Sequence, residues 1–272
     1  AHITSDKVIS VSSGSFGVYP AGSAGDNGYD QLVPVQRVGK EYVIVRYGSL
    51  IEIIRVVATA ANTVITFNGN VVATRNAGEV YQVALPGASG SAHTISATNP
   101  VYIYQTSGRN NDGEVGMALI APLRDDGAGK VRFRSAASNP VVRAVFATSA
   151  RSSLKLTRFN TNGTTTNIPI TATSTVVASK PTVSIITIPV VANTNYELAA
   201  DSFIQSSMVF AASGGGGYSA LSGFEDALVA ARDDNYTVGK NIARVLNVLS
   251  NDTQAAGLPL HLGTFTQPSH GT

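Results

Sequence analysis

The sequence contains no cysteine among its 272 residues. This absence excludes disulfide bridges, thiolate metal sites and cysteine nucleophiles. Small extracellular animal domains usually depend on disulfides, whereas many bacterial surface proteins have none. The composition therefore favours an extracellular or cell-surface location in a bacterium.

Charged residues and long apolar runs are also scarce. Only 13% of the residues are charged, against an average of about 25% in globular proteins. The net charge is +2 and no run of Lys and Arg forms a phosphate-binding stripe, which argues against a nucleic-acid partner. No apolar run approaches the roughly 20 residues that span a bilayer, so we expect no membrane insertion in this segment.

Motifs for catalysis are missing as well. The sequence has no nucleophile elbow and no phosphate-binding loop. We therefore predict that the chain has no catalytic residues and is not an enzyme; an enzyme acting on polysaccharide ranks third among the functions considered. The histidines have no metal-ligand spacing, and each is expected at the surface or in a turn: His2, His93, His261 and His270.

The sequence does show the alternation of apolar and polar residues that is typical of β-strands. Apolar, often β-branched residues alternate with polar ones between Asn, Gly and Pro breaks, and helical periodicity is almost absent. Asn68 and Gly69 predict a tight hairpin, because both residues accept positive φ angles. The pattern predicts an all-β fold of β-sandwich type. The predicted strands are residues 42–46, 51–58, 63–67, 80–85, 141–148, 154–159, 175–178 and 183–191.

Part of the chain also repeats itself. Three anchors recur at offsets of 88, 90 and 88 residues: Pro34 as Pro122, Gly39 as Gly129, and Arg55 as Arg143. Such a steady offset indicates an internal duplication. We therefore predict two tandem, related β-sandwich units.

The duplication and a change of composition after four consecutive glycines divide the chain into four parts. Residues 1–94 form the first predicted unit, and residues 95–222 form the second together with the start of a third copy. Residues 223–231 form a linker. Residues 232–272 form an incomplete β module of the immunoglobulin or cadherin type.

Arg55 and Arg143 lie at equivalent positions inside apolar strands. The favoured interpretation is a side chain that points out of the sheet to solvent or lies along one face with its charged end in water. The alternative is a duplicated ion pair, for example with Glu52.

Three loops rich in Ser and Gly follow alternating strands, and tyrosines lie in or beside them. Aromatic side chains next to polar loops suit contact with carbohydrate or protein, although they also cover clusters at loop ends. We take these tyrosines as the candidate ligand-binding residues: Tyr19, Tyr29, Tyr102, Tyr104 and Tyr218.

Acidic residues near glycine turns are the candidate ligands for calcium, the one cofactor considered. Carboxylates suit a hard cation, but Asp also favours turns without an ion, because its side chain bonds the nearby backbone. The candidates are Asp26, Asp30, Asp112 and, at the predicted module junction, Asp233 and Asp234.

Residues 3–11, 30–35, 39–43 and 57–66 together resemble the IgG Fc-binding protein N-terminal domain family. The resemblance covers residues 3–222. It implies a module of a large secreted or surface protein, of the kind found in bacterial adhesins and in mucin-like animal proteins.

A second resemblance covers the end of the chain. Residues 233–238, 245–253, 257–260 and 267–272 resemble the opening half of a bacterial cadherin-like tandem repeat. This implies a stalk module of a giant adhesin, often with calcium between repeats. Gln254 and the two alanines after it replace acidic positions of the pattern, which removes ligands for that ion.

We therefore expect a non-catalytic adhesion or surface-binding region that recognises a cell-surface glycan or protein through its Gly, Asp and Tyr loops. The alternative is a structural subunit of a filament, sheath or surface layer, whose partners are copies of itself joined by β-edge pairing. Residues 171–191 are the candidate edge, because Lys180 is their one charged residue.

Overall fold

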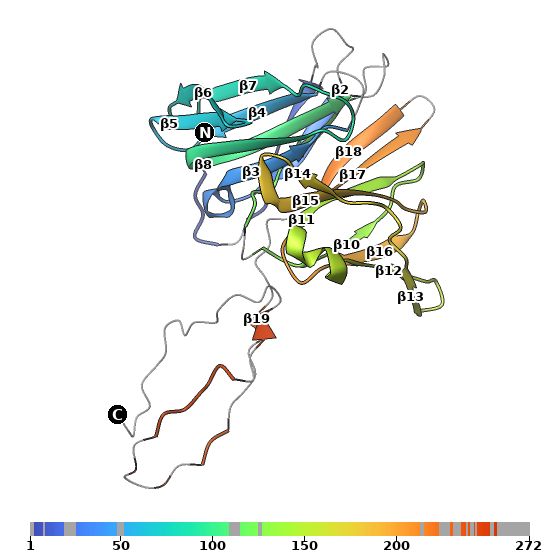
Figure 1. Ribbon diagram of the computed structural model, residues 1–272. Helices are drawn as coiled ribbons and strands as arrows, with labels where there is room; N and C mark the ends of the chain where they lie inside the picture. Colours follow the sequence, from blue (N-terminus) through green and yellow to red (C-terminus); the bar gives the residue numbers. More distant parts are fainter. Residues whose placement is uncertain are drawn as a thin grey trace.

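The computed structural model confirms an all-β fold (Figure 1). It describes residues 3–7, 9–18, 26–47, 52–108, 115–124, 127–212 and 215–222, and short segments between residues 229 and 254. The predicted strands between residues 42 and 191 are all present, with bounds that differ by a few residues. The tight hairpin is confirmed too, since Asn68 and Gly69 have φ angles of 47° and 84°.

The first half of the chain is built around one long strand, β8. Its first part pairs with β3 and β5, and its second part pairs with β4 and β9. One strand therefore joins two runs of paired strands, β6-β5-β8-β3 and β7-β4-β8-β9, within a single seven-stranded sheet. The elements are β1 (Val11–Val18), β2 (Asp26–Leu32), η1 (Val35–Arg37), β3 (Gly39–Val45), β4 (Ile53–Ala58), β5 (Thr63–Phe67), β6 (Asn70–Arg75), β7 (Val80–Ala84), β8 (Ala92–Gly108) and β9 (Val115–Leu119).

The second half contains two sheets, in the orders β10-β16-β12-β13 and β14-β15-β11-β17-β18. A two-stranded pair, β19 (Val229–Ala230) with β20 (Thr253–Gln254), follows. The elements of the two sheets and their connections are β10 (Lys130–Arg134), β11 (Val141–Ala147), η3 (Thr148–Ser153), β12 (Lys155–Phe159), β13 (Thr165–Ile168), β14 (Thr175–Val177), β15 (Lys180–Pro189), β16 (Asn195–Ala199), β17 (Ile204–Ala212) and β18 (Gly215–Ser222).

The two halves have the same strand order, as a duplication requires. The order β3-β8-β5-β6 corresponds to β10-β16-β12-β13, and β7-β4-β8-β9 corresponds to β15-β11-β17-β18. Separate strands β16 and β17 thus take the place of the two parts of β8. Arg55 and Arg143 are each the third residue of corresponding strands, β4 and β11.

The repeated glycines lie at close backbone approaches in both halves. A Cβ atom on Gly39 would lie 2.6 Å from the Cβ atom of Pro122, and one on Gly129 would lie 2.5 Å from the carbonyl oxygen of Ala200. The division of the chain at residues 94 and 95 stays a prediction, and β8 runs across that point.

Three clusters of buried apolar side chains fill the molecule, one inside each half and one between the halves. On β3, Tyr42 and Ile44 belong to the first-half core, whereas Val43 and Val45 belong to the cluster between the halves. Because both faces of this strand are covered, its sequence is a continuous apolar run and does not alternate. Full burial of each such side chain contributes about 1.5–3 kcal/mol.

The junction between the halves also contains buried polar groups. Arg143 is 9% exposed, and its guanidinium lies 4.1 Å from the centre of the Tyr47 ring. It donates hydrogen bonds to the carbonyl of Arg46 and, at 3.0 Å, to the hydroxyl of Ser89. The expectation of a solvent-exposed Arg143 was therefore wrong, because the outer face of its sheet is covered by the first half of the chain.

Glu52 is fully buried beside the junction. Its Oε1 atom accepts a hydrogen bond of 2.8 Å from the backbone N–H of Tyr47, and its Oε2 atom accepts one of 2.7 Å from the amide of Gln105. These two bonds give both oxygens of the buried carboxyl group a partner, which offsets part of the cost of its burial.

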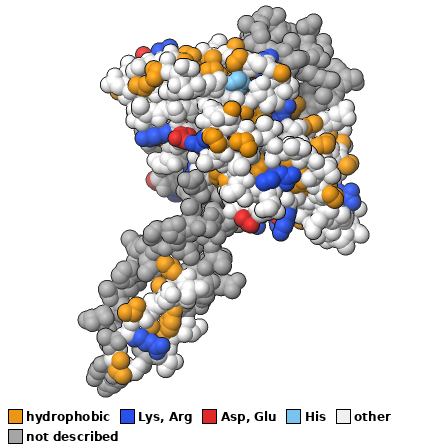
Figure 2. Space-filling model, in the orientation of Figure 1, with side chains coloured by type: hydrophobic (Ala, Val, Ile, Leu, Met, Phe, Trp, Pro, Cys, Tyr) orange, Lys and Arg blue, Asp and Glu red, His pale blue; other side chains and the backbone are white. Residues whose placement is uncertain are grey.

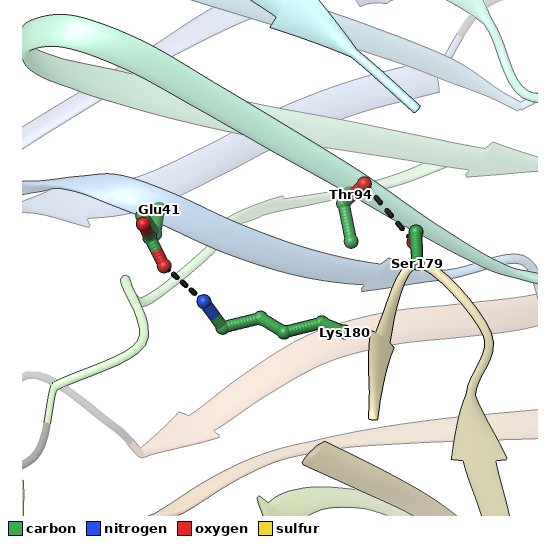
Figure 3. Close-up of polar contacts among 4 residues, drawn as sticks. All are labelled: Glu41, Thr94, Ser179 and Lys180. Atoms are coloured by element: carbon green, nitrogen blue, oxygen red, sulfur yellow. Dashed lines mark hydrogen bonds and ion pairs between the residues drawn. The ribbon is translucent and has the colours of Figure 1, made fainter. Parts of the chain in front are cut away.

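The turn between β14 and β15 contacts the first half directly (Figure 3). Lys180 forms an ion pair with Glu41 of β3, and the Thr94 hydroxyl donates a 3.2 Å hydrogen bond to the Ser179 hydroxyl. Within residues 171–191, β15 is paired on both sides, with β14 and with β11. Much of the predicted assembly edge is therefore occupied within the same chain.

We expect Arg143→Met to lower the free energy of unfolding by about 2–4 kcal/mol, because it leaves buried acceptors without their charged donor. The duplication supplies the control. Arg55→Met changes the equivalent, half-buried arginine and should lower it by less than about 1 kcal/mol. Urea unfolding of both variants measures the difference, and equal losses would contradict the role of Arg143.

His93 is 6% exposed, so its expected place at the surface was wrong. Its Nε2 atom lies 3.1 Å from the Pro86 carbonyl and its Nδ1 atom 3.1 Å from the Asn68 amide, while its ring stacks on Phe67. With Nε2 donating to the carbonyl, Nδ1 accepts from the amide, which is the bonding of a neutral imidazole.

Burial lowers the pKa of His93, and the charge of Arg46 lowers it further, although the bond to Pro86 opposes the shift. The folded protein therefore binds this proton less readily than the unfolded chain does. We expect the stabilisation to be complete above pH about 6.5 and to be lost as the pH falls below that value. Unfolding between pH 7.5 and 5 should show a smaller decline in His93→Gln than in the unmodified protein.

Candidate functional site

The three Ser-Gly loops proposed as the ligand site connect three hairpins, β1–β2, β8–β9 and β17–β18. Strand β9 pairs with β8 and also lies close to β2 and to β18. The hairpins thus form one side of the molecule, with β9 at its centre. We call this the hairpin side. The loop residues 19–25, 109–114 and 213–214 lie outside the described residues.

Two of the five candidate tyrosines can be placed with their side chains. Tyr102 and Tyr104 extend from the outer face of β8, because Val101 and Ile103, which alternate with them, are fully buried in the core. Tyr29 lies in β2 opposite Gly14 of β1, and Tyr218 lies in β18 opposite Val209 of β17, but the side chains of both tyrosines are outside the described part. Tyr19 lies outside it entirely.

The outer face of this sheet brings the tyrosines together with an arginine that the sequence did not assign to the ligand site. Arg55 of β4 is directly opposite Tyr104 of β8 and Gln82 of β7, and Val57 is opposite Tyr102. Side chains opposite each other on neighbouring strands lie about 4.5–5.5 Å apart at Cβ, so these residues form one surface. In the sequence, the position of Arg55 between the apolar residues Ile54 and Val56 was the signal that its side chain lies on the outer face.

The segment around the end of β2 is attached to this face by two hydrogen bonds. The Tyr102 hydroxyl donates to the Val33 carbonyl at 2.8 Å. The backbone N–H of Leu119 in β9 donates to Oδ2 of Asp30 at 2.5 Å, and that of Gln31 donates to Oδ1 at 2.7 Å. Both carboxylate oxygens of Asp30 therefore connect backbone segments.

Calcium binding stays a prediction. The side chain of Asp26 is not described, and Asp112, Asp233 and Asp234 lie outside the described residues. In the part of the chain that the structure describes, no group of three or more acidic or histidine side chains could hold a metal ion.

The ionisable groups of the face are only partly hydrated. Burial raises the pKa of Tyr104 to about 12, with smaller contributions from Tyr102 and Asp30, and burial also raises the pKa of Tyr102. Burial lowers the pKa of Arg55. At neutral pH the face therefore presents neutral phenol groups beside a guanidinium group, which suits hydrogen bonding and ring contacts with a protein or a sugar.

A cavity of about 20 Å³ lies between the halves, lined by residues that include Tyr47, Gln105, Arg143 and Gln205. This volume has room for one water-sized group. This cavity is too small for a sugar or a peptide.

Comparison with protein families gives a match, which covers most of the chain. A family model described as IgGFc binding protein matches residues 1–213. The chain belongs to this family. The match confirms the first resemblance and ends within the hairpin β17–β18. The cadherin-like repeat over residues 232–272 stays a prediction.

The comparison with curated proteins gave no match, and neither did the comparison with solved structures. Among the described residues, no helix is long and apolar enough to cross a membrane.

We expect Tyr102→Phe to lower the free energy of unfolding by about 1 kcal/mol, because it removes the hydrogen bond to the Val33 carbonyl. Tyr104→Phe removes a hydroxyl from the same face and should change it by less than about 0.5 kcal/mol. Amide hydrogen exchange should show faster exchange around residues 30–35 in Tyr102→Phe alone. Equal exchange in the two variants would show that this bond does not hold the segment.

Proposed function

We propose that the chain is a non-catalytic, extracellular adhesion region that binds a protein on another surface through its hairpin side. The observation that carries this proposal is the gathering of three hairpins around β9, beside the face formed by Tyr102, Tyr104 and Arg55. Tyrosine and arginine are enriched where proteins meet, because each combines a large contact area with hydrogen-bond donors.

The scaffold beneath the hairpin side supports this proposal. Strand β8 pairs with four other strands along its length, and the junction with the second half is filled by apolar side chains and by the buried Arg143. Recognition sites commonly lie on loops that a rigid scaffold holds in place. The low charge of the chain fits recognition by shape and hydrogen bonds more than long-range electrostatic attraction.

The family supports a protein partner. The family is named for binding to the Fc part of IgG, so Fc is the first protein to test, followed by cell-surface proteins and glycans.

Two of the sheet edges, β6 and β14, favour adhesion over assembly into a filament. The edge strand β6 has an irregularity in its pairing with β5, and β14 has only three residues and a similar irregularity. Bulges and short edge strands hinder the addition of a further strand. The β14–β15 turn also contacts the first half, which leaves less of this edge open to a second copy.

The test is binding of the purified chain to Fc, to cells and to a glycan array. We expect the double variant Arg55→Ala with Tyr104→Ala to lose at least about tenfold in affinity for whatever partner binds, since residues at the centre of an interface contribute more than about 1 kcal/mol each. Val71→Ala with Arg75→Ala, on edge strand β6, should leave affinity unchanged.

Unchanged binding by the double variant would remove the face of Arg55 and Tyr104 from the interaction. Regular fibres or lattices of the purified chain in electron micrographs would favour the structural subunit instead.

A further inference from the structure

The outer face of the sheet β10-β16-β12-β13 carries a row of cations. Strand β10 alternates Lys130, Arg132 and Arg134, all exposed, with Val131 and Phe133, both buried in the core. Alternate residues of a strand lie on one face about 6.7 Å apart, so the three cations form a line along the edge of the sheet. Because apolar residues separate them in sequence, they do not form the run of Lys and Arg that indicates such a surface.

A fourth cation extends the row across the sheet. Lys130 pairs with Ala199 of β16, and Ala199 pairs in turn with Lys155 of β12. The two lysines therefore lie on strands about 9.5 Å apart, with only a methyl group between them. This arrangement leaves both ammonium groups accessible to one ligand.

Among the described residues, an acidic side chain pairs with only one of the four cations of this face. Glu197 of β16 is bonded to Arg132, with 2.7 Å between Oε2 and Nε, and Asp201 follows two residues after β16 ends. In the described part of the chain, neither Lys130, Arg134 nor Lys155 makes an ion pair. Figure 2 shows Lys and Arg side chains over the region where Figure 1 places β10, β16 and β12.

The remaining residues of the face are neutral donors and acceptors and one aromatic ring. Arg132 lies 5.4 Å from the centre of the Phe159 ring, and Phe159 pairs with Asn195 and Thr165. Thr157 and Asn167 pair with each other in the next row. Hydroxyl and amide groups of this kind can bond the hydroxyl groups of a sugar, and an exposed ring edge or face can pack on its C–H groups.

We propose that this face binds an acidic polysaccharide, with Lys130, Arg134 and Lys155 contacting its carboxylate or sulfate groups. The face is an open sheet surface, so it suits an extended chain whose charges repeat at intervals. A single-stranded nucleic acid would use several stacking rings, and the face offers one, Phe159. The site lies on the sheet β10-β16-β12-β13 of the second half and not on the three hairpins, and it does not depend on the function proposed there.

The test uses the whole chain and four immobilised polymers: heparin for sulfate, polygalacturonate for carboxylate, double-stranded DNA for phosphate, and dextran as the neutral polymer. We expect binding to heparin or polygalacturonate and none to dextran. The affinity should fall as salt rises, because each charge contact releases a bound counterion.

The decisive variant is Lys130→Gln with Arg134→Gln and Lys155→Gln, which leaves the Arg132–Glu197 pair in place. We expect it to bind at least about tenfold more weakly near physiological salt. The slope of log affinity against log salt should also be smaller, because about three charge contacts are lost. The matched control is Lys7→Gln with Lys40→Gln and Arg244→Gln, three exposed cations elsewhere, which should bind like the unmodified chain.

Thermal unfolding of both variants confirms that they are folded. An equal loss in the control variant would show unspecific attraction and overturn the proposal, as would the absence of binding to both acidic polysaccharides. Tighter binding to DNA than to either polysaccharide would assign the face to nucleic acid and would also overturn it.

Discussion

The structure depends on burial of both faces of a few strands where the two halves of the chain meet. Val43 and Val45 of β3 pack against Val145 and Ile185 of the second half, while the alternate residues of the same strands fill the two separate cores. A strand covered on both faces can neither slide nor turn without exposing apolar surface. The halves are therefore held in one arrangement, and Arg143 adds directional bonds where apolar packing is incomplete.

This constraint explains why two copies of one unit differ in what they expose. In the first half, the outer face of β4 and β8 remains partly open and presents Arg55 and the two tyrosines. In the second half, the corresponding face is buried against the first, and the exposed surface is the outer face of the other sheet, with its row of cations. Equivalent residues thus have different surroundings. The duplication produced two distinct surfaces without a change of fold.

Much of the fold could be predicted from the sequence, because alternation and turn residues act locally. The strands, the Asn68–Gly69 hairpin and the all-β class follow from such patterns. The site was harder to predict. The loop tyrosines were identified by composition, but Arg55 joins Tyr104 only through strand pairing, and the buried positions of Arg143 and His93 depend on packing between segments far apart in sequence. Residue type alone had favoured exposure for both.

The sequence by itself determined that the chain is all-β, that it contains a duplication and that it has no cysteine chemistry. These properties depend only on which residues are present and on their spacing. Only the tertiary structure decided which sheet face each half buries. That choice depends on how well two surfaces far apart in sequence fit together, and no local pattern encodes it. It places three hairpins around β9 and leaves the cations of β10 and β12 exposed, so it also decides where a partner can bind.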